Sequence, residues 1–315
     1  MILSCGDALI DFVPATTGQG RDALMPAVGG SCLNVAVGLA RLGAPTGFVG
    51  GISTDVFGSM IAEHAAASNV DLGYATRSDD QTTLAFVRMI AGESHYAFYD
   101  AATASRTWTY PTGRVPFATI DAVHVGSTTL VHDEGATQTR AMIADARHTA
   151  TISFDPNCRP NLVKDKAAYQ ACMEEFAGVA DLIKMSDVDF DYLHGHDRYA
   201  ERAEALLAAG CSLVAVTRGP KGALAWHGNA GAIEVAAPVV NVVDTIGAGD
   251  SFQAALLFAL HKQDRIGKGG LDALTEAELR RALSFAAACA AVTCTRPGAD
   301  PPYWTEMSAT WDGLA

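Results

Sequence analysis

The sequence predicts a three-layer α/β/α fold on a mostly parallel sheet. Short apolar runs of strand character alternate with amphipathic helical patterns along most of the chain. Strands that are buried on both faces and separated by helical crossovers are typical of parallel sheets covered by helices on each side. A length of 315 residues suits one large domain of this kind, and we expect a single domain over residues 1–315.

The elements follow from local patterns. Predicted strands cover residues 2–3, 10–13, 47–52, 122–125, 151–154, 181–185 and 213–216. Predicted helices cover residues 32–42, 56–68, 133–148, 166–178, 200–209, 251–262 and 276–295. Ser31 and Asp55 precede two of these helices and are predicted N-caps, because their side chains can accept the first free backbone N–H groups.

The alternation breaks between residues 72 and 99. Residues 83–90 alternate between the two faces of a strand, Gly92 provides a turn, and residues 96–99 alternate again, which predicts a hairpin. A small sheet that leaves the main body is a candidate lid, formed by segments within about 72–110 and strand residues near 10–20. An edge extension of the main sheet is the alternative.

Composition narrows the class of partner. A formal net charge of −13 argues against nucleic acid and acidic membrane surfaces and favours small molecules. The seven cysteines are odd in number and form no C-x-x-C pair, which fits a reducing cytoplasm. No signal-like segment and no apolar run of about 18 residues occurs, so we expect a soluble, cytoplasmic protein.

The most informative motif is the small-residue turn at Gly247, Ala248 and Gly249, which runs into an apolar helix. Bare backbone N–H groups and the positive end of a helix dipole together favour a bound phosphate. Asp250 would lie beside that phosphate, where it could accept a proton from an attacking hydroxyl. An ordinary helix start capped by an aspartate is the alternative interpretation.

Two long stretches resemble a known family. Residues 28–36, 40–43 and 50–58 resemble the N-terminal signature of the ribokinase-like (PfkB) carbohydrate kinases, and residues 244–252 resemble their C-terminal signature. Residues 6–12 and 83–87 are most similar to the fructokinase branch. Neither a Walker A pattern nor a G-x-G-x-x-G fingerprint occurs.

The resemblance implies a sugar site and a phosphate site. The implied sugar-binding residues are Asp7, Asp11, Gly29, Gly30, Asn34, Phe86, Arg88, Phe98 and Asp250. The implied catalytic residues are Asp250, the turn at Gly247, Ala248 and Gly249, and Arg159, which would face the transferring phosphate. The alternatives are a solvated Asp11, a surface amide at Asn34, a surface Arg159, and lid aromatics that only pack.

The same resemblance implies nucleotide and ion sites. The implied ATP-binding residues are Lys184, Ser186, Thr217, Arg218, Gly219, Gly222, Gly247, Gly249 and Ala287. Ser186 and Asp189 stand where the family usually has Asn and Glu, so Asp189 is expected to reach Mg²⁺ only through water. Asp244 and Ile246 are expected near a monovalent cation, K⁺, bound by backbone carbonyls.

These expectations combine into an ATP-dependent kinase of a neutral sugar, with fructose first. Asp100 stands where sugar-acid kinases and fructokinases commonly carry Arg, and a carboxylate at the pocket mouth would repel a sugar acid. Kinases of 2-keto-3-deoxygluconate, ribose or nucleosides are the alternatives within enzymes, and a sugar-sensing paralogue that does not phosphorylate is the alternative outside them. We also expect a homodimer formed through the lid.

Overall fold

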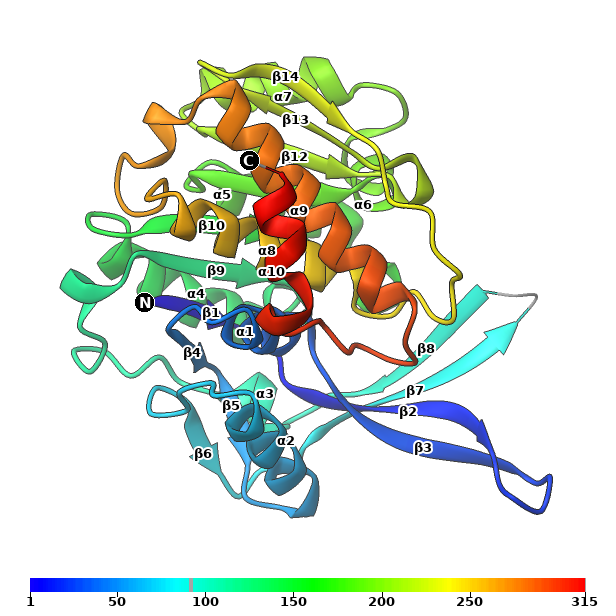
Figure 1. Ribbon diagram of the computed structural model, residues 1–315. Helices are drawn as coiled ribbons and strands as arrows, with labels where there is room; N and C mark the ends of the chain where they lie inside the picture. Colours follow the sequence, from blue (N-terminus) through cyan, green and yellow to red (C-terminus); the bar gives the residue numbers. More distant parts are fainter. Residues whose placement is uncertain (91–92, 315) are drawn as a thin grey trace.

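The structure is a computed structural model that describes residues 1–90 and 93–314 (Figure 1). Its centre is an eight-stranded sheet in the order β14-β13-β12-β11-β10-β9-β1-β4. The strands are β1 (Ile2–Cys5), β4 (Thr46–Val49), β9 (Ala122–Gly126), β10 (Thr151–Asp155), β11 (Leu182–Ser186), β12 (Leu213–Thr217), β13 (Ala223–His227) and β14 (Gly231–Val235). All neighbouring pairs except β12–β13 and β13–β14 are parallel, which confirms the predicted fold class.

Helices cover both faces of this sheet. One apolar layer packs α1 (Ser31–Arg41), α8 (Ala248–Lys262), α9 (Glu276–Cys294) and α10 (Trp304–Gly313) against it. The other layer packs α4 (Asp133–Ala146), α5 (Lys166–Ala177), α6 (Asp187–His194) and α7 (Tyr199–Ala208). Ile2 joins the first layer and its neighbour Leu3 joins the second, as the two-residue period of a strand buried on both faces requires.

A separate four-stranded sheet projects from one end of the main sheet (Figure 1). It contains β2 (Leu9–Thr16), β3 (Asp22–Gly29), β7 (Thr83–Ile90) and β8 (Glu93–Tyr99), in the order β3-β2-β7-β8. The predicted hairpin is thus confirmed as β7–β8, and it belongs to this lid sheet and not to an edge of the main sheet. The predicted turn at Gly92 lies outside the described residues.

Some sequence expectations were wrong in detail. The predicted strand 47–52 is two strands, because the chain leaves the main sheet after Val49 and pairs again as β5 (Gly51–Ser53) with β6 (Thr76–Ser78). The chain changes direction at Gly50, where no larger residue would fit, because a Cβ there would lie 2.4 Å from the Gly6 carbonyl oxygen. The antiparallel pair β13–β14 and the short helix α3 (Ala104–Thr107) were not predicted.

One helix cap connects the lid to the main body. Asp55 precedes α2 (Val56–Ala67), and its carboxylate accepts the Gly58 N–H at 2.7 Å, as predicted for an N-cap. The same carboxylate accepts the Thr82 N–H at 2.8 Å and the Thr82 hydroxyl at 2.6 Å, one residue before β7. Despite partial burial, which acts in the opposite direction, these donors lower the pKa of Asp55.

We expect Asp55→Ala to lower the free energy of unfolding by about 1–2 kcal/mol, because three donors lose their acceptor. Asp55→Asn keeps one acceptor oxygen and should lose less. Urea titrations followed by circular dichroism would measure both. Because the pKa of Asp55 is lowered in the folded protein, its stabilising contribution is lost as the pH falls through that pKa. The difference in free energy of unfolding between wild type and Asp55→Ala should therefore shrink in acid. Equal midpoints for wild type and Asp55→Ala would contradict the assignment.

Candidate active site

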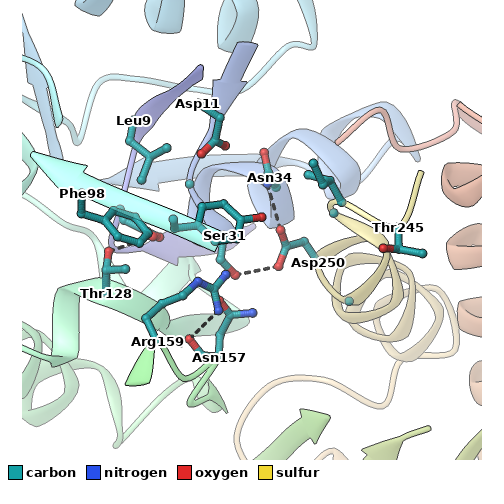
Figure 2. Close-up of a pocket in the computed structure, with 16 residues that line it drawn as sticks. Leu9, Asp11, Ser31, Asn34, Phe98, Thr128, Asn157, Arg159, Thr245 and Asp250 are labelled. Carbon is teal, nitrogen blue, oxygen red and sulfur yellow. Dashed lines mark hydrogen bonds between the residues drawn. The ribbon is translucent and has the colours of Figure 1, made fainter. Parts of the chain in front are cut away.

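A cavity of about 300 Å³ lies where the lid meets the carboxyl ends of the parallel strands (Figure 2). This is the edge at which open α/β sheets bind ligands. The structure brings many of the predicted sugar and phosphate residues into its lining: Asp7, Asp11, Gly30, Asn34, Phe98, Arg159, Gly247, Gly249 and Asp250. The lining also contains Ser31, which was predicted as an N-cap, and Ile246, which was expected near a monovalent cation. The remaining lining residues are Leu9, Tyr96, Thr128, Asn157 and Thr245.

Asp250 is held from two sides by the first turn of α1. Its carboxylate accepts the Ser31 hydroxyl at 2.7 Å and the Asn34 side-chain amide at 2.9 Å (Figure 2). Burial raises the pKa of Asp250, while Ser31, Asn34 and the charges of Lys184 and Arg159 act in the opposite direction. The carboxylate is thus fixed in orientation and more basic than an ordinary aspartate.

The turn before Asp250 has the geometry of an anion site. Gly247 is left-handed, with φ 74°, and a Cβ there would lie 2.5 Å from the Cβ of Ala299. Helix α8 begins at Ala248, so its first free N–H groups and its dipole end face the cavity region lined by Gly247 and Gly249. This arrangement suits a phosphoryl group.

Asp11 presents a second carboxylate to the cavity, in space that Gly29 leaves free. They lie on the neighbouring strands β2 and β3, and a Cβ on Gly29 would lie 2.2 Å from a carboxylate oxygen of Asp11. Gly29 is not part of the cavity lining, but its missing side chain leaves the space that Asp11 occupies. Burial raises the pKa of Asp11 to about 7, with Arg159 acting against it and Asp7 and Asp250 adding to it.

Asp7 has a different environment, although it also borders the cavity. Its carboxylate accepts the Cys32 N–H at 3.0 Å, the Ser127 hydroxyl at 2.9 Å and the Thr128 hydroxyl at 3.0 Å. These three bonds join the end of β1 to the start of α1 and to the turn after β9. Gly30, with φ 103°, has no room for a side chain, because a Cβ there would lie 2.6 Å from the Asp7 carbonyl oxygen.

The loop after β10 carries Arg159 into the cavity. The Nη1 atom of Arg159 donates to the carbonyl oxygens of Asn157 and Cys158, both at 3.0 Å, which fixes the guanidinium beside its own loop (Figure 2). Asp189 holds this loop from behind, because its carboxylate accepts the Cys158 N–H at 2.9 Å.

The remaining contacts of Asp189 define its role in the structure. Its second oxygen accepts the Ser186 hydroxyl at 2.7 Å and the Ser186 N–H at 3.4 Å. The Ser186 hydroxyl in turn accepts the Asp189 N–H at 3.0 Å, and the two backbone donors complete a capping box at the start of α6. Asp189 is 8% exposed, and both of its carboxylate oxygens are bonded inside the protein. The structure does not place it in the cavity lining.

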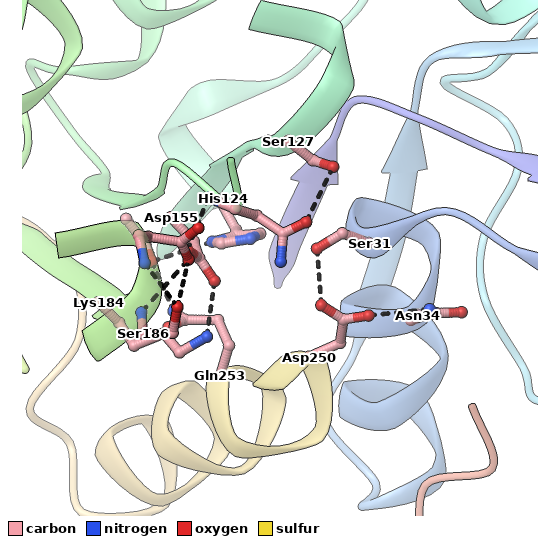
Figure 3. A network of polar contacts seen from close by, with 12 residues as sticks. Ser31, Asn34, His124, Ser127, Asp155, Lys184, Ser186, Asp250 and Gln253 are labelled. Atoms are coloured by element: carbon pink, nitrogen blue, oxygen red, sulfur yellow. Dashed lines mark hydrogen bonds and ion pairs between the residues drawn. The ribbon is translucent and has the colours of Figure 1, made fainter. Parts of the chain in front are cut away.

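A buried ion pair lies beneath the anion turn (Figure 3). Lys184 donates to Asp155 at 2.7 Å, and both side chains are 2% exposed. Burial alone would lower the pKa of Lys184, but Asp155, Asp250 and Asp189 raise it, so the ammonium stays charged. A Cβ on Gly249 would lie 3.3 Å from the Lys184 nitrogen, which puts this cation directly behind the turn.

Apart from Gly247 and Gly249, the predicted nucleotide residues do not line this cavity. Ser186 and Thr217 are partners in the parallel ladder between β11 and β12, so they end neighbouring strands. Gly219 and Gly222 follow in left-handed conformations, and a Cβ on Gly222 would lie 2.0 Å from the Val235 carbonyl oxygen. Arg218 donates to Glu234, and Ala287 is 5% exposed within α9. Gly247 and Gly249 are the members of the predicted nucleotide set that belong to both the anion-binding turn and the cavity lining.

Phe86 and Arg88 were predicted to bind sugar, but they lie on the face of the lid away from the cavity. Directly opposed residues in an antiparallel ladder share a face, and Phe98 opposes Ala85 while Phe86 opposes Ala97. Phe98 lines the cavity and Phe86 therefore lies on the other face, stacked on Phe12 at 4.8 Å between ring centroids. Arg88 shares the face of Phe86 and is exposed.

The expected position of Asp100 at the mouth of the sugar pocket was also wrong. Its carboxylate lies 2.8 Å from the His132 ring nitrogen and 3.6 Å from Arg106, at the base of β8. Asp100 does not line the cavity that contains Asp250. It joins the lid to the segments around α3 and α4 and gives no information on the charge of a substrate.

Asp244 organises the loop before the anion turn. Its carboxylate accepts the Ile246 N–H at 3.0 Å and the Gly298 N–H at 2.8 Å. These bonds draw residues 244–246, where carbonyl ligands for a monovalent cation were expected, together with the segment near Gly298. Across residues 1–90 and 93–314, no group of three His, Cys, Asp or Glu side chains is arranged to hold a metal ion.

The described part of the chain contains no helix with the length and apolar character needed to span a membrane.

Comparisons with known proteins agree with this geometry. The chain is 36% identical over 282 residues to a fructokinase of Rhizobium leguminosarum bv. trifolii, covering 89% of this chain and 86% of that protein. The structure superposes on a fructokinase from Xylella fastidiosa with bound ATP, with a TM-score of 0.87, 28% identity and coverage of 99% and 97%. It also superposes on a double-mutant fructokinase from Vibrio cholerae O395 with fructose, ADP and potassium ion bound, with a TM-score of 0.80, 26% identity and coverage of 99% and 97%.

A family model described as pfkB family carbohydrate kinase matches residues 1–306, nearly the whole chain. The match includes the lid, the loops after β9 and β10, and the anion turn with Asp250. The chain belongs to the pfkB family of carbohydrate kinases.

Proposed function

We propose that this protein is a fructokinase that transfers the γ-phosphate of ATP to a hydroxyl of fructose. The observation that carries the proposal is Asp250, a buried carboxylate of raised pKa fixed at the mouth of an anion-binding helix start. In this position Asp250 takes the proton of the attacking sugar hydroxyl while the backbone N–H groups of the turn stabilise the migrating phosphoryl group. The fructokinase relatives support fructose as the sugar.

The sugar side of the cavity supplies hydrogen-bonding groups of both kinds. Asp11 offers carboxylate oxygens, Asn34 an amide, and Gly30 and Asp7 belong to the same wall. Phe98 supplies an apolar surface for the carbon skeleton. Such a mixture suits a polyol, whose hydroxyls both donate and accept.

The nucleotide side extends from the anion turn along the ends of β11 and β12. Gly247 and Gly249 would hold the terminal phosphate, and Lys184 behind Gly249 adds a buried positive charge. Ser186, Thr217, Arg218, Gly219, Gly222 and Ala287 extend the proposed site toward the base. Arg159 faces the same space from the opposite side and offsets charge on the transferring group.

Mg²⁺ would be carried to this site by the nucleotide phosphates and would not be held directly by Asp155 or Asp189. Asp155 is paired with Lys184, and Asp189 has both oxygens bonded within the protein, so neither is a free ligand. Mg²⁺ retains waters readily and is commonly held through phosphates. When bound, it neutralises phosphate charge, and Asp189 contributes by holding the Arg159 loop.

Two further features belong to the proposal. The loop fixed by Asp244, with Ile246 and the segment near Gly298, offers carbonyl oxygens for K⁺, as the potassium-bound relative suggests. The exposed apolar side chains Leu24, Met25 and Tyr99 lie on the lid and support a homodimer formed through it.

We expect Asp250→Asn to lower kcat by roughly 10²–10⁴-fold with a small change in the KM for fructose. The amide keeps one acceptor for Asn34 and can donate to the Ser31 hydroxyl, so the geometry survives while the basicity is lost. Steady-state ADP release measures both constants. A kcat within about threefold of wild type would contradict the assignment of Asp250 as the base.

A substrate panel tests the function itself. Coupled ADP release with saturating ATP and Mg²⁺ should give the highest kcat/KM for fructose among hexoses, ribose, 2-keto-3-deoxygluconate and nucleosides. A higher kcat/KM for another compound of the panel would make that compound the substrate, and the protein would still be a kinase. Tight sugar binding by calorimetry with no ADP release from any sugar would support the sensing paralogue.

The raised pKa of Asp11, about 7, predicts the pH dependence of sugar use. The carboxylate is the acceptor for sugar hydroxyls, and it is mostly protonated below that pH. We therefore expect kcat/KM for fructose to fall as the pH decreases through about 7. In Asp11→Asn the kcat/KM for fructose should be lower throughout and this fall toward acid pH should disappear. An unchanged fall in Asp11→Asn would show that Asp11 does not titrate in this role.

A further inference from the structure

Tyr96 lies on the cavity face of the lid, two residues before Phe98. The two rings stack with centroids 5.9 Å apart and planes 19° from parallel, and together they form an aromatic wall of the cavity. Unlike Phe98, Tyr96 carries a hydroxyl. Burial raises the pKa of this hydroxyl, and the charges of Asp11 and Asp250 raise it further while Arg159 lowers it. The hydroxyl therefore lies within the field of the groups that surround the sugar position.

Asn161 fixes the backbone of Tyr96. Its side-chain amide donates to the Tyr96 carbonyl oxygen at 2.9 Å. Asn161 belongs to the short 3₁₀ turn Pro160–Leu162, which begins directly after Arg159. This bond thus joins lid strand β8 to the loop that carries the arginine of the opposite cavity wall.

This connection has a geometric consequence. A strand residue whose carbonyl is fixed has little freedom to rotate its side chain out of its face, because the side chain follows the backbone. Asn161 therefore ties the Tyr96 backbone, and with it the cavity face of β8, to the loop that carries Arg159. A sugar bound between them is met by an aromatic face and a hydroxyl on one side and by the guanidinium on the other.

We propose that Tyr96 contacts the sugar and determines affinity for it, and that Asn161 is the positioning residue for Tyr96. This inference rests on the proposed function, because it assumes that the cavity binds a sugar. It adds a recognition group from the lid that the sequence did not indicate and a role for an exposed loop asparagine.

The first test uses fructose as the probe. Asn161→Ala and Asn161→Asp both remove the donor, and each should raise the KM for fructose by about 2–10-fold, the range for loss of one hydrogen bond, with the KM for ATP unchanged. Tyr96→Phe should raise the KM for fructose similarly, and Tyr96→Ala more. Asn229→Ala is the matched control, because Asn229 also donates to a backbone carbonyl, that of Asp272 at 2.6 Å, away from the cavity.

Non-additivity separates positioning from a general loss of structure. In the Tyr96→Ala background, Asn161→Ala should change the KM for fructose by less than about twofold, because no ring remains to be positioned. A full effect of Asn161→Ala in that background would show that it acts through Arg159 instead. Equal increases in the KM for ATP and for fructose, or no increase for fructose, would overturn the proposal.

A second measurement needs no substrate. Hydrogen exchange in the ligand-free protein should be faster at residues 96–99 in Asn161→Ala and Asn161→Asp than in wild type, and unchanged there in Asn229→Ala. If the substrate panel rejects fructose, the proposed function fails separately, and the same variants are compared with the sugar that the panel identifies. Unchanged exchange at residues 96–99 would overturn the positioning role whatever the sugar is.

Discussion

The structure depends on the carboxylate of Asp250 and the two donors that hold it. Ser31 and Asn34 are three residues apart on α1 and lie 219 and 216 residues from Asp250 in sequence. A buried carboxylate without donors is costly, so the first turns of α1 and α8 must meet. They can do so because the helices pack closely: a Cβ on Gly38 would lie 2.7 Å from the Cβ of Ala254. The constraint that packs the two helices also orients the proposed base.

A second set of contacts fixes the loops that face Asp250. Ser127 and Asn157 follow the neighbouring strands β9 and β10, and both adopt left-handed backbone conformations, with φ 61° and 40°. Such conformations cost free energy for residues other than glycine and persist where the surroundings enforce them. Here the Ser127 hydroxyl donates to Asp7 at 2.9 Å and lies 3.2 Å from the Asn157 side-chain oxygen. These left-handed residues therefore lie at the site itself, where Asp7 holds the Ser127 side chain and Ser127 contacts Asn157.

The sequence predicted what depends on local pattern and motif. The parallel sheet follows from the alternation of strands and helices, and the anion turn follows from its glycines and Asp250. Ser31 shows the limit: a serine before an apolar helix is expected to be its N-cap, but the cap is Gly30, and Ser31 donates to Asp250. That partner is 219 residues away, and no local rule identifies it.

The lid shows a second limit. Alternation within β7 and β8 predicts two faces, but which residues of the two strands share a face depends on their register. The ladder pairs Phe98 with Ala85, which puts Phe86 and Arg88 away from the cavity and Tyr96 into it. With the register known, the same alternation identifies Tyr96 at once. Asn161 gave no signal in the sequence, because its contact crosses from a loop to a backbone carbonyl of the lid.

The charges that line the cavity favour a neutral substrate, although Asp100 is not among them. Asp7 is satisfied by three donors, but Asp11 and Asp250 both present carboxylates to the cavity against one guanidinium, that of Arg159. The Nη1 atom of that guanidinium already donates to two carbonyl oxygens of its own loop. A sugar acid would bring a further negative charge beside Asp11, whereas a neutral polyol can donate its hydroxyls to Asp11 and Asp250. The geometry of the site therefore favours a neutral sugar, on residues that line the cavity and not on a residue at the base of the lid.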